Sequence, residues 1–224
     1  MIQLKNLSRE FQVGNQVVHA LNAVDLVISE GEYVSIMGVS GCGKTTLLNI
    51  LGLLDTPSSG DYVLSGIDTS EMNDDEMAHI RSTKIGFVFQ SFHLIPRLTA
   101  AENIEIPMIL AGISRGERAA KVAKALSRVN LSDRSDHRPE QLSGGQRQRV
   151  AIARSIVMEP KVLLADEPTG NLDSTSGSEI IDLIEELNQG GLTLIVVTHD
   201  KEISRRSDRI VELLDGKIIT DKEH

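Results

Sequence analysis

The chain has 224 residues, a hydrophobic content of 40%, a charged content of 25% and a formal net charge of −9. These values are ordinary for a globular protein and leave room for one large domain. The acidic balance argues against a nucleic-acid partner, for which a basic surface is expected. The sequence therefore predicts no nucleic-acid binding.

Cysteine usage and hydropathy bear on location. Cys42 is the single cysteine, which excludes an internal disulfide and fits a reducing compartment. The first residues lack the pattern of a secretory signal, and no apolar run approaches the ~18 residues of a membrane span. We therefore expect an intracellular protein with no signal peptide or transmembrane helix, which can still dock on a membrane partner.

Short apolar runs predict strands in the first part of the chain. "YVSIM" at Tyr33–Met37 and "KIGFVFQ" at Lys84–Gln90 are strand candidates. The first leads into "GVSGCGKTTLLNILGLL", which is expected to form a loop and then a buried helix. The N-terminal third, with "YVLSG" at Tyr62–Gly66, is expected to add an antiparallel sheet.

The middle of the chain, from about residue 91 to residue 160, has a mostly helical pattern that includes Ser114–Val129. Beyond it, near-continuous apolar runs at Val162–Asp166 and Thr193–His199 are typical of parallel strands covered on both faces. An amphipathic helix over Ser174–Asn188 separates them, which implies a right-handed parallel crossover. A hairpin with its turn at Asp215 and Gly216 is expected at the end.

Residues 38–45, "GVSGCGKT", match the phosphate-loop pattern G-x-x-x-x-G-K-[ST] between a strand and a helix. Glycines let backbone N–H groups close on the β-phosphate, Lys44 neutralises the β- and γ-phosphates, and the Thr45 hydroxyl can ligate Mg²⁺. The expected ATP-binding residues here are Gly38, Val39, Ser40, Gly41, Cys42, Gly43, Lys44, Thr45 and Thr46.

The predicted fold is therefore α/β, with a P-loop NTPase core of mostly parallel sheet and flanking helices. An N-terminal antiparallel β subdomain and a helical subdomain inserted at about 91–160 complete it. We expect residues 1–224 to form a single domain, with the core and the antiparallel sheet supplied by residues 1–90 and 161–224.

Two acids end the apolar strand "VLLAD". Asp166 is expected to hold Mg²⁺, directly or through water. Glu167 follows where the chain leaves the strand, and a carboxylate there can polarise a water aimed at the γ-phosphate. A surface acid that caps a strand is the ordinary interpretation, but the phosphate loop makes Glu167 the leading candidate for a general base.

Three other residues have less specific signals. His199 ends the next strand, at the edge where doubly wound sheets bind ligands, and can contact the γ-phosphate or orient the water. The amide of Gln90 can reach Mg²⁺ or the water, although a polar strand end is an equally good interpretation. Phe11 can stack on adenine, but a core role is the default for a lone Phe.

A second glycine-rich helix start, "LSGGQ", stands at 142–146. Backbone N–H groups at such a start can hold phosphate. The stretch carries no lysine, while a complete phosphate loop lies upstream.

Together these motifs resemble the nucleotide-binding subunits of ABC transporters. They stand in family order: the phosphate loop at 38–45, the glutamine at 90, "LSGGQ" at 142–146, "LLADE" at 163–167, "NLD" at 171–173 and the histidine at 199. The resemblance covers essentially the whole chain. "GFVFQSFHLIPRLTAAENIEIPMILAG" and "LADEPTGNLD" look like the ATPases of the macrolide-export and lipoprotein-release class.

The resemblance implies a role for each matching residue. The catalytic set is Glu167 as base, His199 as switch, Gln90 and Lys44. The Mg²⁺ set is Thr45, Gln90 and Asp166. Phe11 takes the position of the aromatic residue that stacks on adenine. Cys42 stands where serine is more usual, and we expect thiol alkylation there to inhibit and ATP to protect.

The resemblance also implies a homodimer or pseudo-dimer, in which two subunits face head to tail and each ATP lies between the phosphate loop of one and the "LSGGQ" of the other. This explains the missing lysine. The residues expected to act on the partner's ATP are Ser143, Gly144, Gly145, Gln146 and Asp173. Residues Phe92–Glu102 are expected to line a groove for a transmembrane permease subunit, or else to fill the helical core. The expected location is peripheral, on the cytoplasmic face of the inner or plasma membrane.

Two other functions remain open from the sequence. One is the ATPase of a membrane-bound cell-division or signalling complex that moves no solute. The other is a soluble ABC protein acting on nucleic acid or ribosomes, which the absence of sustained heptads between Lys44 and Ser143, the single ATPase domain and the acidic charge all disfavour.

Overall fold

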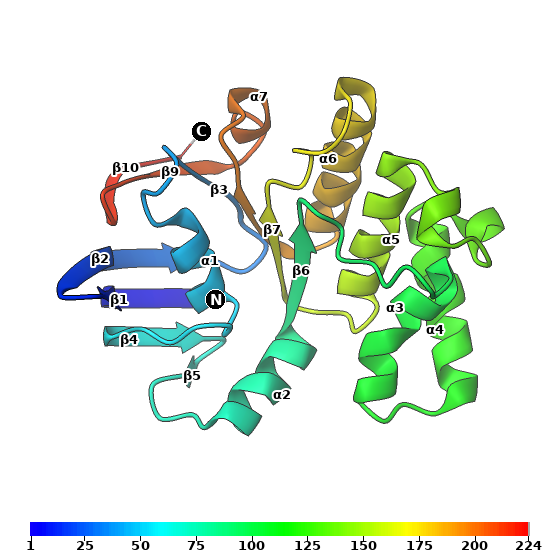
Figure 1. Ribbon diagram of the computed structural model, residues 1–224, viewed down its shortest axis with the longest axis horizontal. Coiled ribbons are helices and arrows are strands. Elements are labelled where there is room, and N and C mark those ends of the chain that lie inside the picture. The colour runs from blue at the N-terminus through cyan, green and yellow to red at the C-terminus, as the bar shows by residue number, and fades with distance from the viewer. Residues whose placement is uncertain (224) are drawn as a thin grey trace.

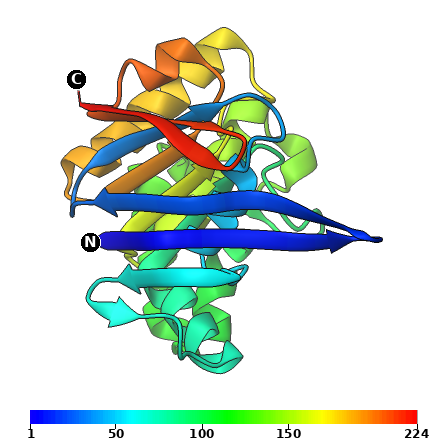
Figure 2. The same ribbon diagram turned by 90° about the vertical axis from the view of Figure 1, so that its left-hand side faces the viewer.

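The computed structural model describes residues 1–223, which form two sheets with helices packed on them (Figure 1). The first sheet is antiparallel, with the strand order β2-β1-β4-β5. Its strands are β1 Ile2–Val13, β2 Gln16–Ile28, β4 Ser59–Leu64 and β5 Ile67–Asp68. Ile2, Leu4 and Leu7 of β1 are buried, and Figure 2 shows the β1–β2 hairpin extending beyond the body of the protein.

The second sheet has the strand order β10-β9-β3-β8-β7-β6. Its strands are β3 Tyr33–Gly38, β6 Ile85–Phe89, β7 Val162–Asp166, β8 Thr193–Val197, β9 Arg209–Leu214 and β10 Lys217–Glu223. All but β10 run parallel to their neighbours, and β10 pairs antiparallel with β9. The register pairs Asp166 with Phe89 on one side and with Val197 on the other. The carboxyl ends of β6, β7 and β8 therefore lie at one edge.

Helices cover both faces of the parallel sheet. Helix α1 (Lys44–Leu51) shares a buried core with strands of both sheets. Helices α6 (Ser174–Gln189) and α7 (Lys201–Ser204) contribute to a second core on the opposite face. Along β7, Leu164 points into the first core and Leu163 into the second. Burial on both faces explains the unbroken apolar runs of the sequence.

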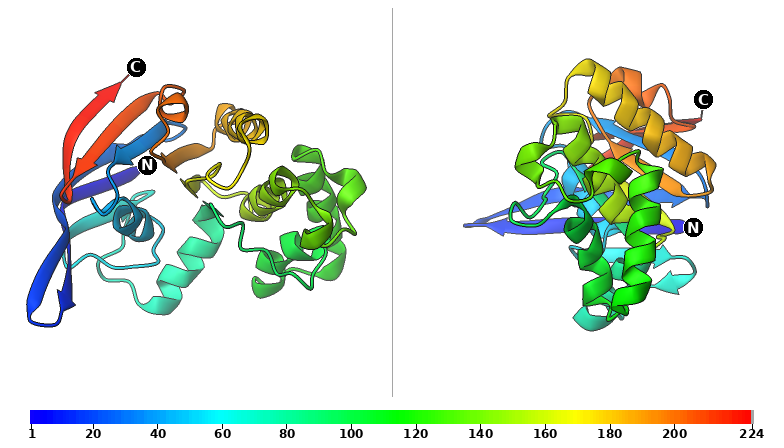
Figure 3. Two further views of the ribbon diagram at one scale, coloured as in Figure 1. Left: turned by 45° about the horizontal axis from the view of Figure 1, so that its top comes forward. Right: turned by 90° about the vertical axis from the view of Figure 1, so that its right-hand side faces the viewer.

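The middle of the chain is helical. It contains α3 Ala100–Leu110, α4 Arg115–Arg128, two short 3-10 turns at Ser132–Arg134 and Pro139–Gln141, and α5 Gly144–Ile156. Figure 3 shows α3 and α4, in green, at the side of the molecule away from the antiparallel sheet. Helix α5 packs on both of them and on β6. The predicted helical insertion in an α/β core is confirmed. No helix within residues 1–223 has both the length and the apolar character to cross a membrane.

One helix differs from the sequence-based expectation. Helix α2 (Asp74–Lys84) lies between the expected strands Tyr62–Gly66 and Lys84–Gln90, in a segment for which no helix was expected. Asn73 and Glu76 form a reciprocal capping box at its start. None of its residues is fully buried. Met77 and Ile80 pack partly buried against the core, and this apolar stripe is too short for helical periodicity to be recognised. As a consequence β6 begins at Ile85, because Lys84 is the last residue of α2.

Candidate functional site

The phosphate loop, residues 38–45, connects the end of β3 to the first turn of α1. Two of its glycines have backbone angles and neighbours that exclude a side chain. Gly38 has φ 150°, and a Cβ there would lie 2.3 Å from the carbonyl oxygen of Leu213. Gly43 has φ 106°, and its Cβ would lie 2.3 Å from the carbonyl oxygen of Ala20. The loop is thus packed against β9 and β2 as well as against its own strand and helix.

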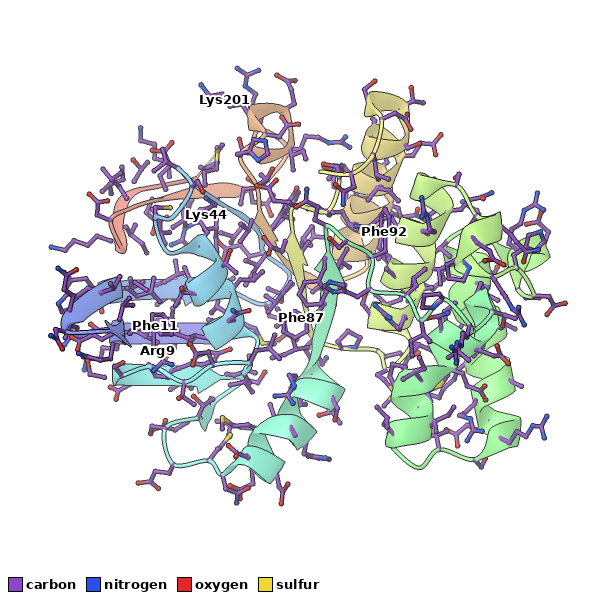
Figure 4. All side chains as sticks on the ribbon, in the orientation of Figure 1. Arg9, Phe11, Lys44, Phe87, Phe92 and Lys201 are labelled. Carbon is purple, nitrogen blue, oxygen red and sulfur yellow. The ribbon has the colours of Figure 1, made fainter. Side chains whose placement is uncertain are left out.

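Lys44 begins α1 and folds back over this loop (Figure 4). Its Nζ donates hydrogen bonds to the carbonyl oxygens of Gly38 at 2.8 Å and Val39 at 2.9 Å. The ammonium group is therefore held above the loop by neutral acceptors only. An anion placed in the loop offers a stronger, charge-assisted partner.

A cleft of about 680 Å³ opens over the loop. From the loop and α1 it is lined by Gly38, Val39, Ser40, Gly41, Gly43, Lys44, Thr45 and Thr46. The strand ends add Gln90, Asp166, Glu167 and His199. The structure therefore brings these predicted site residues together. Phe11, Cys42, Asp173 and residues 143–146 do not line the cleft.

The acidic side of the cleft is the end of β7. Burial, together with the neighbouring carboxylate of Glu167, raises the pKa of Asp166, and Lys44 partly opposes that shift. Glu167 has φ 45°, a left-handed conformation that is uncommon for a residue with a side chain. Its N–H donates to the carbonyl oxygen of Val197 at 2.9 Å. The strained turn directs the carboxylate toward the end of β8 rather than along the strand.

Glu167 contacts two consecutive side chains after β8. His199 Nδ1 lies 2.7 Å from Glu167 Oε1, and the Thr198 hydroxyl donates to Oε2 at 3.3 Å. The hydrogen bond to the Glu167 carboxylate, together with its negative charge, raises the pKa of His199. The predicted strand through His199 ends at Val197, so both side chains belong to a loop. Thr198 was not predicted, because a hydroxyl beside an apolar run has no distinctive pattern.

Gln90 follows the last residue of β6 and is linked to the loop after β7. Its Nε2 donates to Asn171 Oδ1 at 3.4 Å, and Asn171 Nδ2 donates to the carbonyl oxygen of Gln90 at 3.0 Å. A Cβ on Gly170 would lie 2.6 Å from Gln90 Nε2. The link with Asn171 was not predicted, because the two residues are far apart in the sequence.

Phe11 lies near the end of β1 and does not line the cleft. Its partner on β2 is Val18, which does line the cleft. The Arg9 guanidinium carbon lies 4.6 Å from the centre of the Phe11 ring (Figure 4). Two hydrogen bonds, at 2.9 and 2.7 Å, fix that guanidinium on the carboxylate of Asp55. Phe11 is 39% exposed, so the ring is not part of the buried core.

The "LSGGQ" motif forms the start of α5. The Ser143 hydroxyl accepts from the N–H of Gln146 at 3.2 Å, and Gln146 Oε1 accepts from the N–H of Ser143 at 2.9 Å. A Cβ on Gly144 would lie 3.2 Å from Leu172, and one on Gly145 3.2 Å from Ser176. The glycines therefore allow the helix start to pack closely on the segment that begins α6.

Two further predicted residues have local roles. Asp173 caps α6 by accepting from the N–H of Ser176 at 2.9 Å, a bond that lowers its pKa. Cys42 is buried, at 3% exposure. A reagent must therefore displace the loop around the thiol to reach it, and inhibition by alkylation with protection by ATP stays a prediction.

A second hollow, of about 650 Å³, lies between α2 and β6 on one side and α3 and α5 on the other. Its walls include Phe87, Ile106, Pro107 and Leu110. Residues 92–102, which were expected to line a docking groove, are absent from its walls. They lie beside it, because Arg154 lines the hollow and also binds the carbonyl oxygen of Phe92.

Comparison with known proteins identifies the family. The family described as ABC transporter matches residues 21–170. The chain belongs to the ABC transporter family. It is an ABC-type ATP-binding cassette, and its enzymatic activity is ATP hydrolysis. The predicted family, fold and enzyme class are thereby confirmed.

Relatives at about 50% identity agree with the expected class. The chain is 51% identical over 219 residues to the uncharacterized ABC transporter ATP-binding protein YknY of Bacillus subtilis, and the match covers 98% of this chain and 95% of that protein. It is 49% identical over 221 residues to the macrolide export ATP-binding/permease protein MacB of Brucella melitensis. That match covers 99% of this chain but 34% of MacB, so the chain spans about a third of that relative.

Solved structures show the same fold. Two structures of the cassette MJ0796 have a TM-score of 0.91 and 46% sequence identity, and each match covers 100% of this chain and 98% of the other. One is described as a dimeric, post-hydrolysis state bound to ADP and Pi, and the other as a dimeric bacterial ABC transporter cassette. Both curated relatives are described as ATP-binding proteins, and one of the two structures is described as bound to ADP and Pi.

Proposed function

We propose that this chain is the ATP-hydrolysing subunit of a membrane transporter and that it dimerises around two ATP molecules. Each ATP lies between the phosphate loop of one subunit and the "LSGGQ" motif of the other. One observation carries the proposal: the cleft over the phosphate loop contains Glu167 and His199 but none of residues 143–146. Within residues 1–223 the signature is thus separate from the chain's own cleft, as expected if it completes the partner's site.

The chemistry follows from the groups in the cleft. The backbone of residues 38–45 and the Lys44 ammonium hold the phosphates, and Phe11 stacks on the adenine. The oxygen of the attacking water bonds to the γ-phosphorus while Glu167 accepts a proton from that water. ADP departs with the bridging oxygen. His199 orients Glu167 and contacts the γ-phosphate. The 2.7 Å contact between these two side chains supports that pairing.

The donor set of the cleft fits Mg²⁺. Thr45, Gln90 and Asp166 line the same cleft and offer a hydroxyl, an amide oxygen and a carboxylate, which are the hard oxygen ligands that Mg²⁺ prefers. Residues 1–223 contain no cluster of three or more His, Cys, Asp or Glu side chains suited to a metal. The three ligands Thr45, Gln90 and Asp166 suit an ion that is held mainly by the substrate phosphates, with Asp166 binding it directly or through water. Bound there, Mg²⁺ neutralises charge on the phosphates.

The signature completes the site in trans. Ser143, Gly144, Gly145 and Gln146 present the N-terminus of α5, where backbone N–H groups and the helix dipole favour an anion. Asp173 caps α6, whose first turn packs beside them. Closure of the dimer places this positive helix end opposite Lys44 of the partner, so two subunits together surround each γ-phosphate.

The membrane partner docks in the hollow between α2, β6, α3 and α5. Leu110 at its rim is 83% exposed, and the walls carry Phe87 and Pro107. We assign this groove to an amphipathic helix of a transmembrane permease, which lays its apolar face into such a surface. MacB, which is described as an export ATP-binding/permease protein, supports an export-type partner. The cassette then works on the cytoplasmic face of the membrane.

The decisive experiment is Glu167→Gln. Removing the base should slow steady-state hydrolysis by about 10²–10⁴-fold while leaving ATP binding intact. The dimer should therefore accumulate in the ATP-bound form, as measured by light scattering after size-exclusion chromatography with ATP. Robust hydrolysis by the variant contradicts the assignment of Glu167, and a protein that stays monomeric with ATP contradicts the shared site.

A further inference from the structure

Gln148 connects the ends of two site strands through one side-chain amide. It lies in the second turn of α5 and is fully buried, at 0% exposure. Its Nε2 donates to the carbonyl oxygens of Pro168 at 2.6 Å and Phe89 at 3.3 Å. Each carbonyl belongs to a neighbour of a site residue, because Phe89 precedes Gln90 and Pro168 follows Glu167.

The other half of the same amide is left without a partner. Within residues 1–223, Gln148 Oε1 is buried and makes no hydrogen bond. A buried amide oxygen with no partner costs stability. An apolar side chain of similar size would fill this space without the unpartnered oxygen, but it would leave the carbonyl oxygens of Phe89 and Pro168 without the amide donor. The amide is therefore poorly explained by packing, and its two donated bonds are the contacts that distinguish it from an apolar residue.

Two arginines of α5 fasten the chain just after Gln90 to the same helix. Arg154 donates to the carbonyl oxygens of His93 at 2.6 Å and Phe92 at 3.0 Å. The Arg147 guanidinium lies 5.1 Å from the centre of the Phe92 ring, which Figure 4 places between β6 and α5. Phe92 and His93 both have left-handed φ angles, of 56° and 49°. Such a pair persists only where surrounding contacts hold it.

We propose that Gln148 is a positioning residue that couples Gln90 and Glu167 of one subunit to the "LSGGQ" helix of that same subunit. The inference rests on the proposed function, in which this helix start contacts the ATP bound by the partner. Because α5 is a rigid element, a shift at Ser143 moves Gln148 and, through its two bonds, the strand ends that carry Gln90 and Glu167. Binding at one ATP site thereby adjusts the catalytic residues at the other.

The variant Gln148→Met tests this role. Methionine keeps the length and the unbranched shape of glutamine but cannot donate a hydrogen bond. Asn188→Leu is the matched control. Asn188 Nδ2 donates to the carbonyl oxygens of Gly31 at 2.9 Å and Leu192 at 2.8 Å, a bridge of the same kind at the end of α6 and away from the cleft.

The two variants should differ in kinetics rather than in folding. We expect similar losses of thermal stability from each. Only Gln148→Met should lower kcat, by about tenfold or more, and should bring the Hill coefficient for ATP down to about 1. Calorimetric titration of the monomeric subunit with ATP should give an unchanged Kd for both variants, because neither side chain lines the cleft.

Three outcomes decide the matter. Equal kcat and Hill coefficient in Gln148→Met and Asn188→Leu overturn the inference. If Gln148→Met does not fold, Gln148→Leu takes its place. If neither Gln148 variant folds while Asn188→Leu does, Gln148 is a purely structural residue and the inference is overturned. Glu167→Gln in the same assay distinguishes a failure of the proposed function from a failure of the coupling. Full hydrolysis by that variant refutes the proposed function, whereas an inactive Glu167→Gln beside a fully cooperative Gln148→Met refutes only the coupling.

Discussion

His199 Nδ1 lies 2.7 Å from Glu167 Oε1, so the candidate base and the histidine in the loop after β8 form a direct pair. The side chain of Glu167 is 20% exposed, whereas that of His199 is 77% exposed. The histidine is therefore the solvent-facing partner. A base that is hydrogen-bonded in this way is oriented by a group that can also turn toward a phosphate.

The pairing predicts an altered titration of His199. Glu167 raises the pKa of His199 above its ordinary value of about 6.5, and Glu167→Gln should bring it back down. NMR titration of the ring Cε1–H signals, with His199→Ala to assign the resonance, measures this directly. Identical midpoints in the wild type and in Glu167→Gln would show that the pair does not form in solution.

The same shift sets the pH dependence of stability. Because the folded-state pKa is raised, the contribution of the pair to stability is fully present below the unfolded pKa of about 6.5 and is lost as pH rises through the folded pKa. The stability difference between the wild type and Glu167→Gln should therefore be larger at acid pH than at alkaline pH. Denaturant unfolding at a series of pH values checks this, and a difference that grows with pH would contradict it.

Removal of Lys44 should abolish tight nucleotide binding. A charge-assisted hydrogen bond contributes about 1.5–3 kcal/mol, so Lys44→Ala should weaken ATP binding by roughly ten- to a hundredfold and stop turnover. Lys217→Ala, at an exposed position of β10, is the control and should bind ATP normally. Wild-type affinity in Lys44→Ala, measured by calorimetry, would refute the role assigned to the loop.

Ser143→Arg should separate binding from dimer closure. A large cation at the start of α5 obstructs the partner's ATP, while the cleft of the same chain is untouched. Loss of the cap costs about 1 kcal/mol of stability. Ser114→Arg, at the start of α4 where the serine makes no capping bond, should dimerise normally in the Glu167→Gln background. Light scattering measures the dimer. If Ser143→Arg also dimerises with ATP in the Glu167→Gln background, the result counts against action in trans.

Arg9 should support the stacking role of Phe11. Stacking of a base on an aromatic ring contributes about 1–3 kcal/mol, so Phe11→Ala should weaken ATP binding by roughly five- to a hundredfold. Arg9→Ala should have a smaller effect, because the cation–π contact contributes about 0.5–1 kcal/mol. The double variant should be no weaker than Phe11→Ala alone, since Arg9 acts through the ring. Unchanged affinity in Phe11→Ala would remove Phe11 from the site.

The hollow between α2 and α3 should bind the membrane partner. Leu110→Asp places a charge on its exposed rim and should prevent co-purification of one defined permease from gently solubilised membranes. ATP hydrolysis by the isolated cassette should not change. Ile219→Asp, at a 58% exposed position on β10, should retain the permease. Retention by Leu110→Asp would place the docking surface elsewhere.

Much of the site could be predicted because its parts follow local rules. Each part is set by residues close together in the sequence: the loop by the glycines of residues 38–45, the acidic strand end by the apolar run before it, and the start of α5 by the serine before Gly144. The parallel strands were predictable because burial on both faces leaves an unbroken apolar run. Helix α2 was missed for the converse reason, since none of its residues is fully buried. The contacts of Thr198 with Glu167 and of Asn171 with Gln90 were not predicted, because each joins segments far apart in the sequence.

The sequence by itself determined the chemical groups and the local backbone that presents them: a phosphate loop with Lys44, acids at 166 and 167, and a lysine-free helix start at Ser143. Only the tertiary structure decided which of these meet. Parallel register placed Gln90, Asp166 and His199 at one edge, left the signature outside that cleft, and put Gln148 of the signature helix against the carbonyls of Phe89 and Pro168. Distances between segments far apart in the chain depend on packing, which local sequence patterns do not encode.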